Sequence, residues 1–125
     1  MSDVPTVGYV YFITNPSYRE NIYKVGMTTD PHNRMGGLFT TGVPEPFIIK
    51  YLVKFRNNEY TRVESYIHRV FVPQRINGRR EFFNITEDQV SAIVELIKDK
   101  GELVDPSEYN QLQVTSRRKK RQIII

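Results

Sequence analysis

The stretch VGYVYFIT at residues 7–14, followed by NIYKVGM at residues 21–27, contains the clearest structural signal in this chain. Both segments are rich in β-branched and aromatic residues, and the turn formers Asn15, Pro16 and Ser17 lie between them. This pattern predicts two antiparallel strands joined as a β-hairpin.

A register that sets Tyr11 opposite Lys24 gives this hairpin one polar and one apolar face. The polar face would carry Tyr9, Tyr11, Lys24 and Gly26, and the apolar face Val10, Phe12, Tyr23 and Val25. We expect the apolar face to pack on helices. The polar face, with two hydroxyls, an ammonium group and a bare glycine, would then line a cleft.

Outside the hairpin, the sequence predicts further helices and strands. A capping side chain before Pro31 indicates a short helix over residues 31–38. The nearly continuous apolar run at residues 47–55 is typical of a strand in the middle of a sheet. Helical spacing of apolar residues predicts helices over 59–71 and 86–100, with a short strand between them after the turn Asn77-Gly78. The expected class is α+β, a small mixed sheet with about three helices packed on it.

The length of 125 residues suits one domain with one modest core. We expect this domain to span residues 1–104. From Asp105 onward the apolar periodicity disappears, so residues 105–125 are predicted to be a mobile tail that contains a basic run at 117–121.

The net charge of +4 is unevenly distributed along the chain. Residues 1–86 carry 11 bases and 7 acids, residues 87–116 carry two lysines against seven acids, and the run at 117–121 adds five bases. Net charge alone therefore does not locate a nucleic-acid face. We expect the acidic residues between Glu87 and Glu108 to lie away from any site that binds a polyanion.

The composition also excludes several kinds of site. Because cysteine is absent and only His32 and His68 are present, disulfides, thiolate zinc sites and multi-histidine zinc centres are excluded. A hard cation bound through oxygen atoms remains compatible with the chain. No signal peptide and no membrane-spanning apolar run are apparent, so we expect an intracellular protein, cytoplasmic or nuclear, with no membrane partner.

Several motifs occur in a fixed order. Tyr9-Val10-Tyr11 is followed after twelve intervening residues by Lys24-Val25-Gly26, Arg34 lies eight residues after Gly26, and Glu64 lies on the long helix predicted over 59–71. This order resembles a GIY-YIG nuclease domain over residues 7–85. The Lys-Val-Gly variant, VPEPF at residues 43–47, the pair Glu64 and His68, and REFF at residues 80–83 are similar to the phage and large-virus branch named after a bacteriophage T-five open reading frame.

The resemblance implies a metal-dependent endonuclease that hydrolyses phosphodiester bonds in nucleic acid, here expected to be DNA, and a viral or phage origin. Tyr11 would activate water, Arg34 would steady the scissile phosphate, and Glu64 would hold a single Mg²⁺ or Mn²⁺ ion. Lys24 beside Tyr11 is expected to lower the pKa of that tyrosine. Tyr9 completes the catalytic candidates.

Other residues carry weaker expectations. His68 either orients Glu64 or is an ordinary helix histidine, and Asn84 matches the asparagine that ends the family's active-site set. Basic side chains expected to follow phosphates are Arg69, Arg75, Arg79, Arg80, Arg117, Arg118, Lys119, Lys120 and Arg121. The basic run is alternatively a nuclear-import patch or a solubilising tail.

Each candidate also has a purely structural explanation. The two tyrosines are ordinary strand residues in many proteins, Arg34 is compatible with a solvated helix position, and Glu64 with His68 is compatible with a surface pair. The alternative function is a catalytically silent nucleic-acid-binding module on the same fold. A partner-binding domain with a vestigial cleft is a third, more distant possibility.

Overall fold

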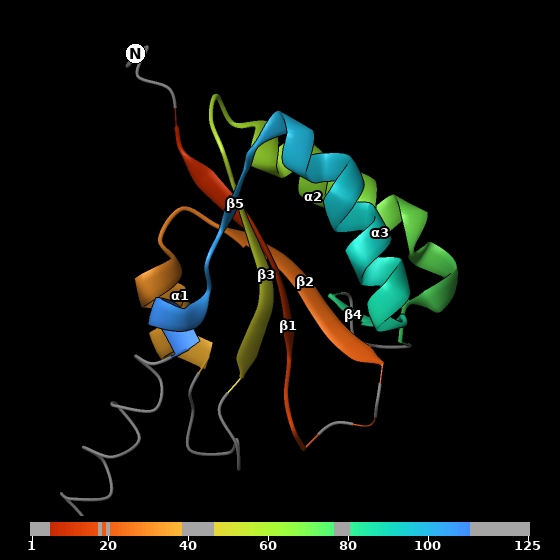
Figure 1. The fold of residues 1–125 in the computed structure, drawn as a ribbon. Coiled ribbons are helices and arrows are strands. Elements are labelled where there is room, and N and C mark those ends of the chain that lie inside the picture. Colours follow the sequence, from red (N-terminus) through yellow and green to blue (C-terminus); the bar gives the residue numbers. More distant parts are fainter. Residues whose placement is uncertain (1–5, 18, 20, 39–46, 77–80, 111–125) are drawn as a thin grey trace, which may run out of the picture.

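The structure is a computed structural model that describes residues 6–17, 19, 21–38, 47–76 and 81–110. The order of elements along the chain is shown in Figure 1 and is β1 (Gly8–Thr14), β2 (Ile22–Thr28), α1 (Pro31–Leu38), β3 (Ile48–Phe55), α2 (Glu59–Val70), η1 (Val72–Gln74), β4 (Phe82–Asn84), α3 (Glu87–Ile97), η2 (Lys98–Lys100) and β5 (Glu102–Val104). Among these described helices, none has the length and apolar character needed to cross a bilayer.

The five strands form one sheet in the order β4-β2-β1-β3-β5. The α+β class is confirmed, and β3 is an interior strand as predicted. Every described pair of neighbouring strands is antiparallel, so the expectation of a mixed sheet is wrong. The strand β5 was not predicted, because three residues directly after a helix are too short to show an alternating pattern.

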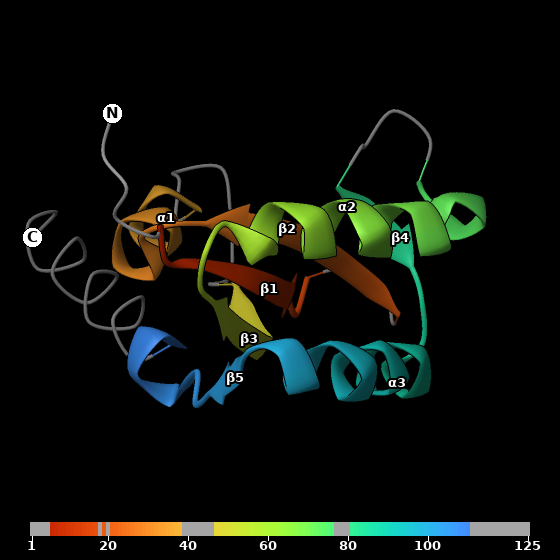
Figure 2. The same ribbon diagram turned by 90° about the horizontal axis from the view of Figure 1, so that it is seen from above.

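Helices cover both faces of the sheet (Figures 1 and 2). On one face, α2 and α3 pack over the apolar side of the hairpin, and the larger core cluster joins Phe12 and Val25 to Ile67 and Val94. This confirms the predicted apolar face. On the other face, α1 and a helical turn at 107–110 cover a smaller cluster that includes Tyr11. The face predicted to be polar is therefore partly a core of its own.

The hairpin register differs from the predicted one. Tyr11 lies opposite Gly26, and Lys24 lies opposite Ile13. Because side chains alternate along a strand, this shift of two residues leaves every side chain on its predicted face. The connection between the strands includes an Asx turn, in which Ser17 donates from its backbone nitrogen and its hydroxyl to Asn15 Oδ1.

The predicted mobile tail is wrong for residues 105–110. The Asn110 side chain accepts a hydrogen bond from the Ile49 backbone nitrogen at 2.9 Å and donates to the Ile49 carbonyl at 3.3 Å. Tyr109 is buried in the smaller core cluster, with its ring 4.8 Å from that of His32. Residues 105–110 have no periodic apolar pattern. Their position is fixed by the cap at Asp105, by the hydrogen bonds of Asn110 and by the contact between the rings of Tyr109 and His32. The rest of the tail, residues 111–125, lies outside the described residues, as do residues 43–46 and the turn at 77–80.

Replacing Asn110 by alanine should destabilise the fold by about 1–3 kcal/mol, because a buried backbone amide and carbonyl at Ile49 would both lose their partner. The free energy of unfolding from urea denaturation measures this loss. Asn33→Ala, at an exposed position of α1, is the matched control and should change it by less than about 0.5 kcal/mol. Equal losses in the two variants would contradict a clamp at Ile49.

Candidate active site

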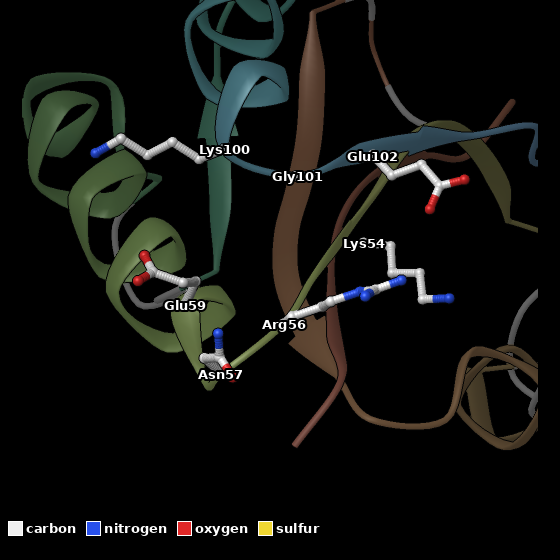
Figure 3. Close-up of a pocket in the computed structure, with 7 residues that line it drawn as sticks. All are labelled: Lys54, Arg56, Asn57, Glu59, Lys100, Gly101 and Glu102. Carbon is white, nitrogen blue, oxygen red and sulfur yellow. The ribbon is translucent and has the colours of Figure 1, made fainter. Parts of the chain in front are cut away.

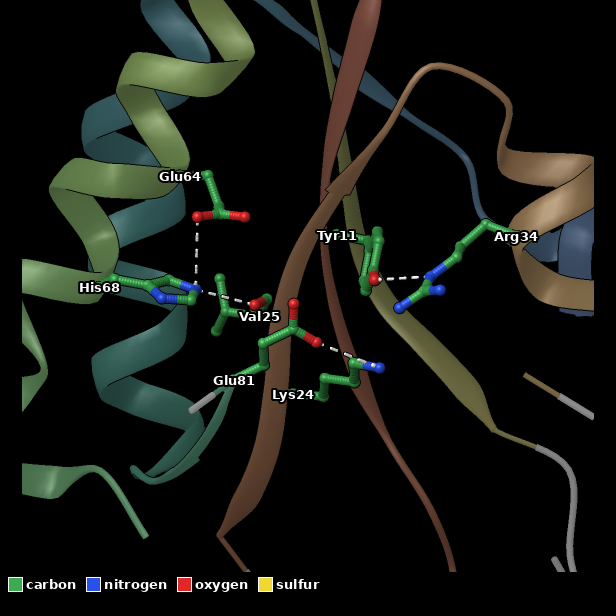
Figure 4. A network of polar contacts seen from close by, with 7 residues as sticks. All are labelled: Tyr11, Lys24, Val25, Arg34, Glu64, His68 and Glu81. Atoms are coloured by element: carbon green, nitrogen blue, oxygen red, sulfur yellow. Dashed lines mark hydrogen bonds and ion pairs between the residues drawn. The ribbon is translucent and has the colours of Figure 1, made fainter. Parts of the chain in front are cut away.

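Tyr11 and Arg34 form the first contact of the site (Figure 4). The Arg34 Nε group donates a hydrogen bond to the Tyr11 hydroxyl at 3.0 Å. Tyr11 lies on the central strand β1, and Arg34 lies in the first turn of α1. Asp30 starts that helix, because its carboxylate accepts from the backbone nitrogen of Asn33 at 3.1 Å. The capping side chain predicted before Pro31 therefore sets the position of Arg34.

The proton affinity of Tyr11 depends on its burial and on Arg34. Tyr11 is 2% exposed, and this burial raises the pKa of its hydroxyl above the ordinary value. The hydrogen bond and charge of Arg34 act in the opposite direction, and the charges of Glu81 and Glu64 raise the pKa further. The sequence predicts Lys24 as the residue that lowers the pKa of Tyr11. In the structure Gly26 lies opposite Tyr11, and Lys24 lies two residues away from that position along β2.

Lys24 is instead paired with a carboxylate from the edge of the sheet. Its ammonium nitrogen lies 3.3 Å from Glu81 Oε2 and 5.7 Å from the centre of the Phe82 ring. Burial lowers the pKa of Lys24, the charge of Arg34 lowers it as well, and Glu81 raises it. Glu81 was not assigned a role from the sequence. Its one signal was its place in the REFF motif.

The backbone of Val25, on β2, forms hydrogen bonds with two residues near the site, Glu81 and His68. Its N–H group donates to the Glu81 carbonyl at 2.9 Å, directly before β4 begins. Its own carbonyl lies 2.9 Å from His68 Nε2. Since a carbonyl only accepts, His68 Nε2 is the donor in this hydrogen bond. His68 thus satisfies the β2 carbonyl that β4 does not reach.

Glu64 lies one helical turn before His68 on α2, and its carboxylate is directed toward β2 (Figure 4). Its side chain is 15% exposed, and Glu64 Oε1 lies 3.7 Å from His68 Nε2. Burial raises the pKa of Glu64, the nearby His68 lowers it, and the charge of Glu81 raises it. Within the described residues, no lysine or arginine pairs with Glu64.

The structure brings Tyr11, Arg34, Lys24 and Glu64 into one neighbourhood, with Glu81 between the two halves (Figure 4). We call these five residues the polar cluster. They come from β1, α1, β2, α2 and the residue directly before β4, so distant parts of the chain are needed to assemble them. The cluster holds a phenol, two cations and two carboxylates, a set of groups able to bind a phosphate and to exchange a proton with water.

The predicted metal ligand, Glu64, fits a divalent ion only if the protein contributes a single ligand. The described part of the chain contains no group of three or more histidine or acidic side chains arranged around a common point. A partly buried carboxylate whose pKa is raised by burial is stabilised by a cation, and Mg²⁺ keeps most of its water ligands. Glu64 therefore fits as the single protein ligand of such an ion.

A small crevice lies beside Tyr11, between α1 and β3. The crevice there is lined by Thr28, Pro31, Arg34, Ile49 and Leu52 together with Tyr11, and it is too narrow to admit a water molecule. Side chains of the smaller core cluster, which the sequence did not assign to this face, fill the space.

The remaining described candidates take other positions in the fold. Tyr9 is half-buried against the smaller core cluster, and Asn84 is exposed on β4 opposite Ile22. The Arg75 guanidinium lies 5.7 Å from the Phe83 ring centre, and Arg69 is exposed on α2. Outside the described residues lie Arg79, Arg80, Arg117, Arg118, Lys119, Lys120 and Arg121.

One acidic residue of the C-terminal part, Glu108, contacts the helix that carries Arg34. Glu108 Oε1 lies 3.8 Å from His32 Nε2, two residues before Arg34 on α1. This contact places Glu108 beside α1, the helix that carries Arg34. The cause is the same turn at 107–110 that folds back onto α1 and β3.

Comparison with known proteins gives one match. The family model described as the T5orf172 domain matches residues 8–98, well over half of the chain. No curated protein and no solved structure matches at a significant level. The matched range begins with β1 and ends directly after α3, so it contains every residue of the polar cluster.

Proposed function

Since the chain belongs to the family of T5orf172 domains, which are GIY-YIG-like and nuclease-associated, we propose that it is a metal-dependent endonuclease that hydrolyses phosphodiester bonds in DNA. The family itself supports a nuclease-like or nucleic-acid-related domain. The observation that carries the finer proposal is the polar cluster, in which a buried tyrosine hydroxyl contacts an arginine near a partly buried glutamate.

Arg34 is proposed to bind the scissile phosphate. Its Nε group is occupied by the Tyr11 hydroxyl, and its two terminal nitrogens carry further donors that match phosphate oxygens. Lys24, held by Glu81, adds a second positive charge near the same place. Preorganised cations stabilise the charge that develops on the phosphate in the transition state.

Tyr11 is proposed to accept the proton of the attacking water. An unperturbed tyrosine is ionised to about one part in a thousand at pH 7, and burial reduces this fraction further in Tyr11. The hydrogen bond from Arg34 supports the phenolate and offsets part of the effect of burial. The reaction should therefore be slow near neutral pH and faster in alkaline solution.

Glu64 would hold the single Mg²⁺ or Mn²⁺ ion, with water and substrate oxygens as its other ligands. When bound, the ion would polarise the phosphate and stabilise the leaving oxygen. His68 is proposed as a positioning residue, because its bond to the Val25 carbonyl fixes the ring beside the Glu64 carboxylate.

A catalytically silent nucleic-acid-binding module is the second candidate, and one observation favours it. The crevice beside Tyr11 and Arg34 admits no water molecule, and the attacking water needs a place near the Tyr11 hydroxyl. Such a module would bind nucleic acid through the same cations without cutting it.

Purified protein should convert supercoiled plasmid to nicked or linear DNA with Mg²⁺ or Mn²⁺, and conversion should stop when EDTA is added. Agarose gel electrophoresis of a time course measures this. A labelled RNA of similar length, tested in parallel, reports whether DNA is preferred. Binding without cleavage in both metals would support the silent module and contradict the nuclease.

Replacing Gly26 by alanine should reduce cleavage by about a hundredfold, because a Cβ atom there would overlap the hydroxyl and ring of Tyr11 and displace them. The matched control is Gly8→Ala on the same hairpin, where a Cβ atom would meet the ring of Tyr60 on the opposite side of the sheet. Both variants should lose stability, but only Gly26→Ala should lose activity per folded molecule. Equal activity in the two would argue against a role for the position of Tyr11.

A further inference from the structure

Two adjoining hollows lie on the flank of α2 that is turned away from Glu64 and His68. The first, of about 530 Å³, lies between the end of β3, the start of α2 and the start of β5 (Figure 3). It is lined by Lys54, Arg56, Asn57, Glu59, Lys100, Gly101 and Glu102. Figure 3 shows Lys100 reaching toward α2 from one side, with Lys54 and Arg56 on the other.

The second hollow, of about 560 Å³, lies between α2 and α3. Its lining residues are Glu59, Arg62, Val63, Tyr66, Arg69, Leu96, Ile97 and Lys100. Since Glu59 and Lys100 line both hollows, the two form one continuous surface. We call this surface the α2–α3 groove.

The charge of the groove favours an anion. Its lining contains five cations and two carboxylates, namely Lys54, Arg56, Arg62, Arg69 and Lys100 against Glu59 and Glu102. In the described part of the chain, none of these five cations forms an ion pair with a carboxylate, although two carboxylates line the same surface. The positive charge is therefore available to a ligand.

The groove also presents an aromatic ring between its cations. Tyr66 is 43% exposed and lies on α2 between Arg62 and Arg69, at helical spacings that put all three side chains on one flank. Val63 and Ile97 form an apolar floor beneath it. A ring for stacking with cations on either side is the arrangement by which proteins bind single strands, in which bases stack and phosphates pair with basic side chains.

We propose that the α2–α3 groove binds a single-stranded segment of nucleic acid, with a base on Tyr66 and its phosphates on Arg62, Arg69 and Lys100. The inference rests on the proposed function in one respect, the choice of nucleic acid as the occupant. Glu64 and His68 lie on the other flank of α2, so the groove and the polar cluster can be occupied together. The groove then holds a part of the substrate that the polar cluster does not cut.

The test is fluorescence anisotropy with a labelled single-stranded oligonucleotide and the full chain in EDTA, so that cleavage does not interfere. The double variant Arg62→Gln/Arg69→Gln should weaken binding by about tenfold at moderate salt and lower the salt dependence by one to two ion equivalents. Tyr66→Leu should weaken single-strand binding by about fivefold and leave duplex binding nearly unchanged. The charge-matched control is Arg19→Gln/Lys50→Gln, at two exposed positions outside the groove.

Each outcome decides the question. A selective loss in the groove variants supports the proposal, whether or not the wild-type protein cuts DNA. An equal loss of binding in the control variant would show that general electrostatic attraction, and not the groove, binds the oligonucleotide, and it would overturn the proposal. Unchanged binding of the oligonucleotide by the groove variants would also overturn the proposal, and the occupant could then be an acidic peptide. That result would not affect the proposed cleavage at the polar cluster. Circular dichroism confirms that all variants are folded.

Discussion

The variant Tyr11→Phe should cleave DNA about a hundredfold to ten-thousandfold more slowly than the wild-type protein. Phenylalanine fills the same buried space on β1 but lacks the hydroxyl that contacts Arg34. The proposed proton acceptor is therefore removed with little change in packing. Single-turnover cleavage of a labelled duplex measures the rate, and the urea midpoint should stay close to that of the wild type.

The pH dependence separates a proton acceptor from a merely structural tyrosine. Because burial raises the pKa of Tyr11, the hydroxyl stays protonated through pH 7–9, and only a small phenolate fraction is present. That fraction grows about tenfold with each pH unit, so the wild-type rate should rise nearly as steeply. The residual rate of Tyr11→Phe should lack this dependence. Parallel profiles in both proteins would exclude Tyr11 as the base.

The variant Glu64→Gln should lose about a hundredfold to a thousandfold in cleavage rate and gain stability at neutral pH. Burial raises the pKa of Glu64, so the folded state binds a proton more tightly than the unfolded state does. Stability contributed by this group is therefore present at low pH and lost as pH rises through the raised pKa. Glutamine resembles the protonated form and avoids that loss.

Thermal unfolding at pH 7 tests this opposition of activity and stability. Glu64→Gln should melt at a higher temperature than the wild type without metal, and Mn²⁺ should raise the melting temperature of the wild type only. Glu95→Gln is the matched control, since Glu95 lies on α3 in an exposed pair with Lys98. It should keep full activity and change stability by less than about 1 kcal/mol. Loss of stability in Glu64→Gln would contradict the view that its buried charge is unfavourable without a cation.

The hairpin shows how far the sequence determines this site. Alternation along strands assigns each side chain to a face, and those assignments agree with the structure because a shift of two residues preserves them. The same alternation carries no information on which residue lies opposite Tyr11. Long-range packing sets that register. As a result Arg34, and not the predicted Lys24, is the partner of the Tyr11 hydroxyl.

Other features depend on contacts between distant parts of the chain. Glu81 joins the site because the backbone of Val25 bonds to it, and nothing in its local sequence indicates an acidic partner for Lys24. Asn110 lies 61 residues from Ile49 in a segment without periodicity, so its clamp on β3 is invisible before the sheet is assembled. The motif order, by contrast, predicted the family, which the match over residues 8–98 confirms.

One plasmid-nicking time course with Mn²⁺, at equal concentrations of folded protein, compares the wild-type protein with Tyr11→Phe and Glu64→Gln and so tests whether the polar cluster is the active site of a nuclease. We expect metal-dependent nicking by the wild type and at least about a hundredfold slower nicking by each variant. Nicking that is equally fast in all three would show that the polar cluster is not the active site. No nicking by the wild type would contradict the nuclease itself.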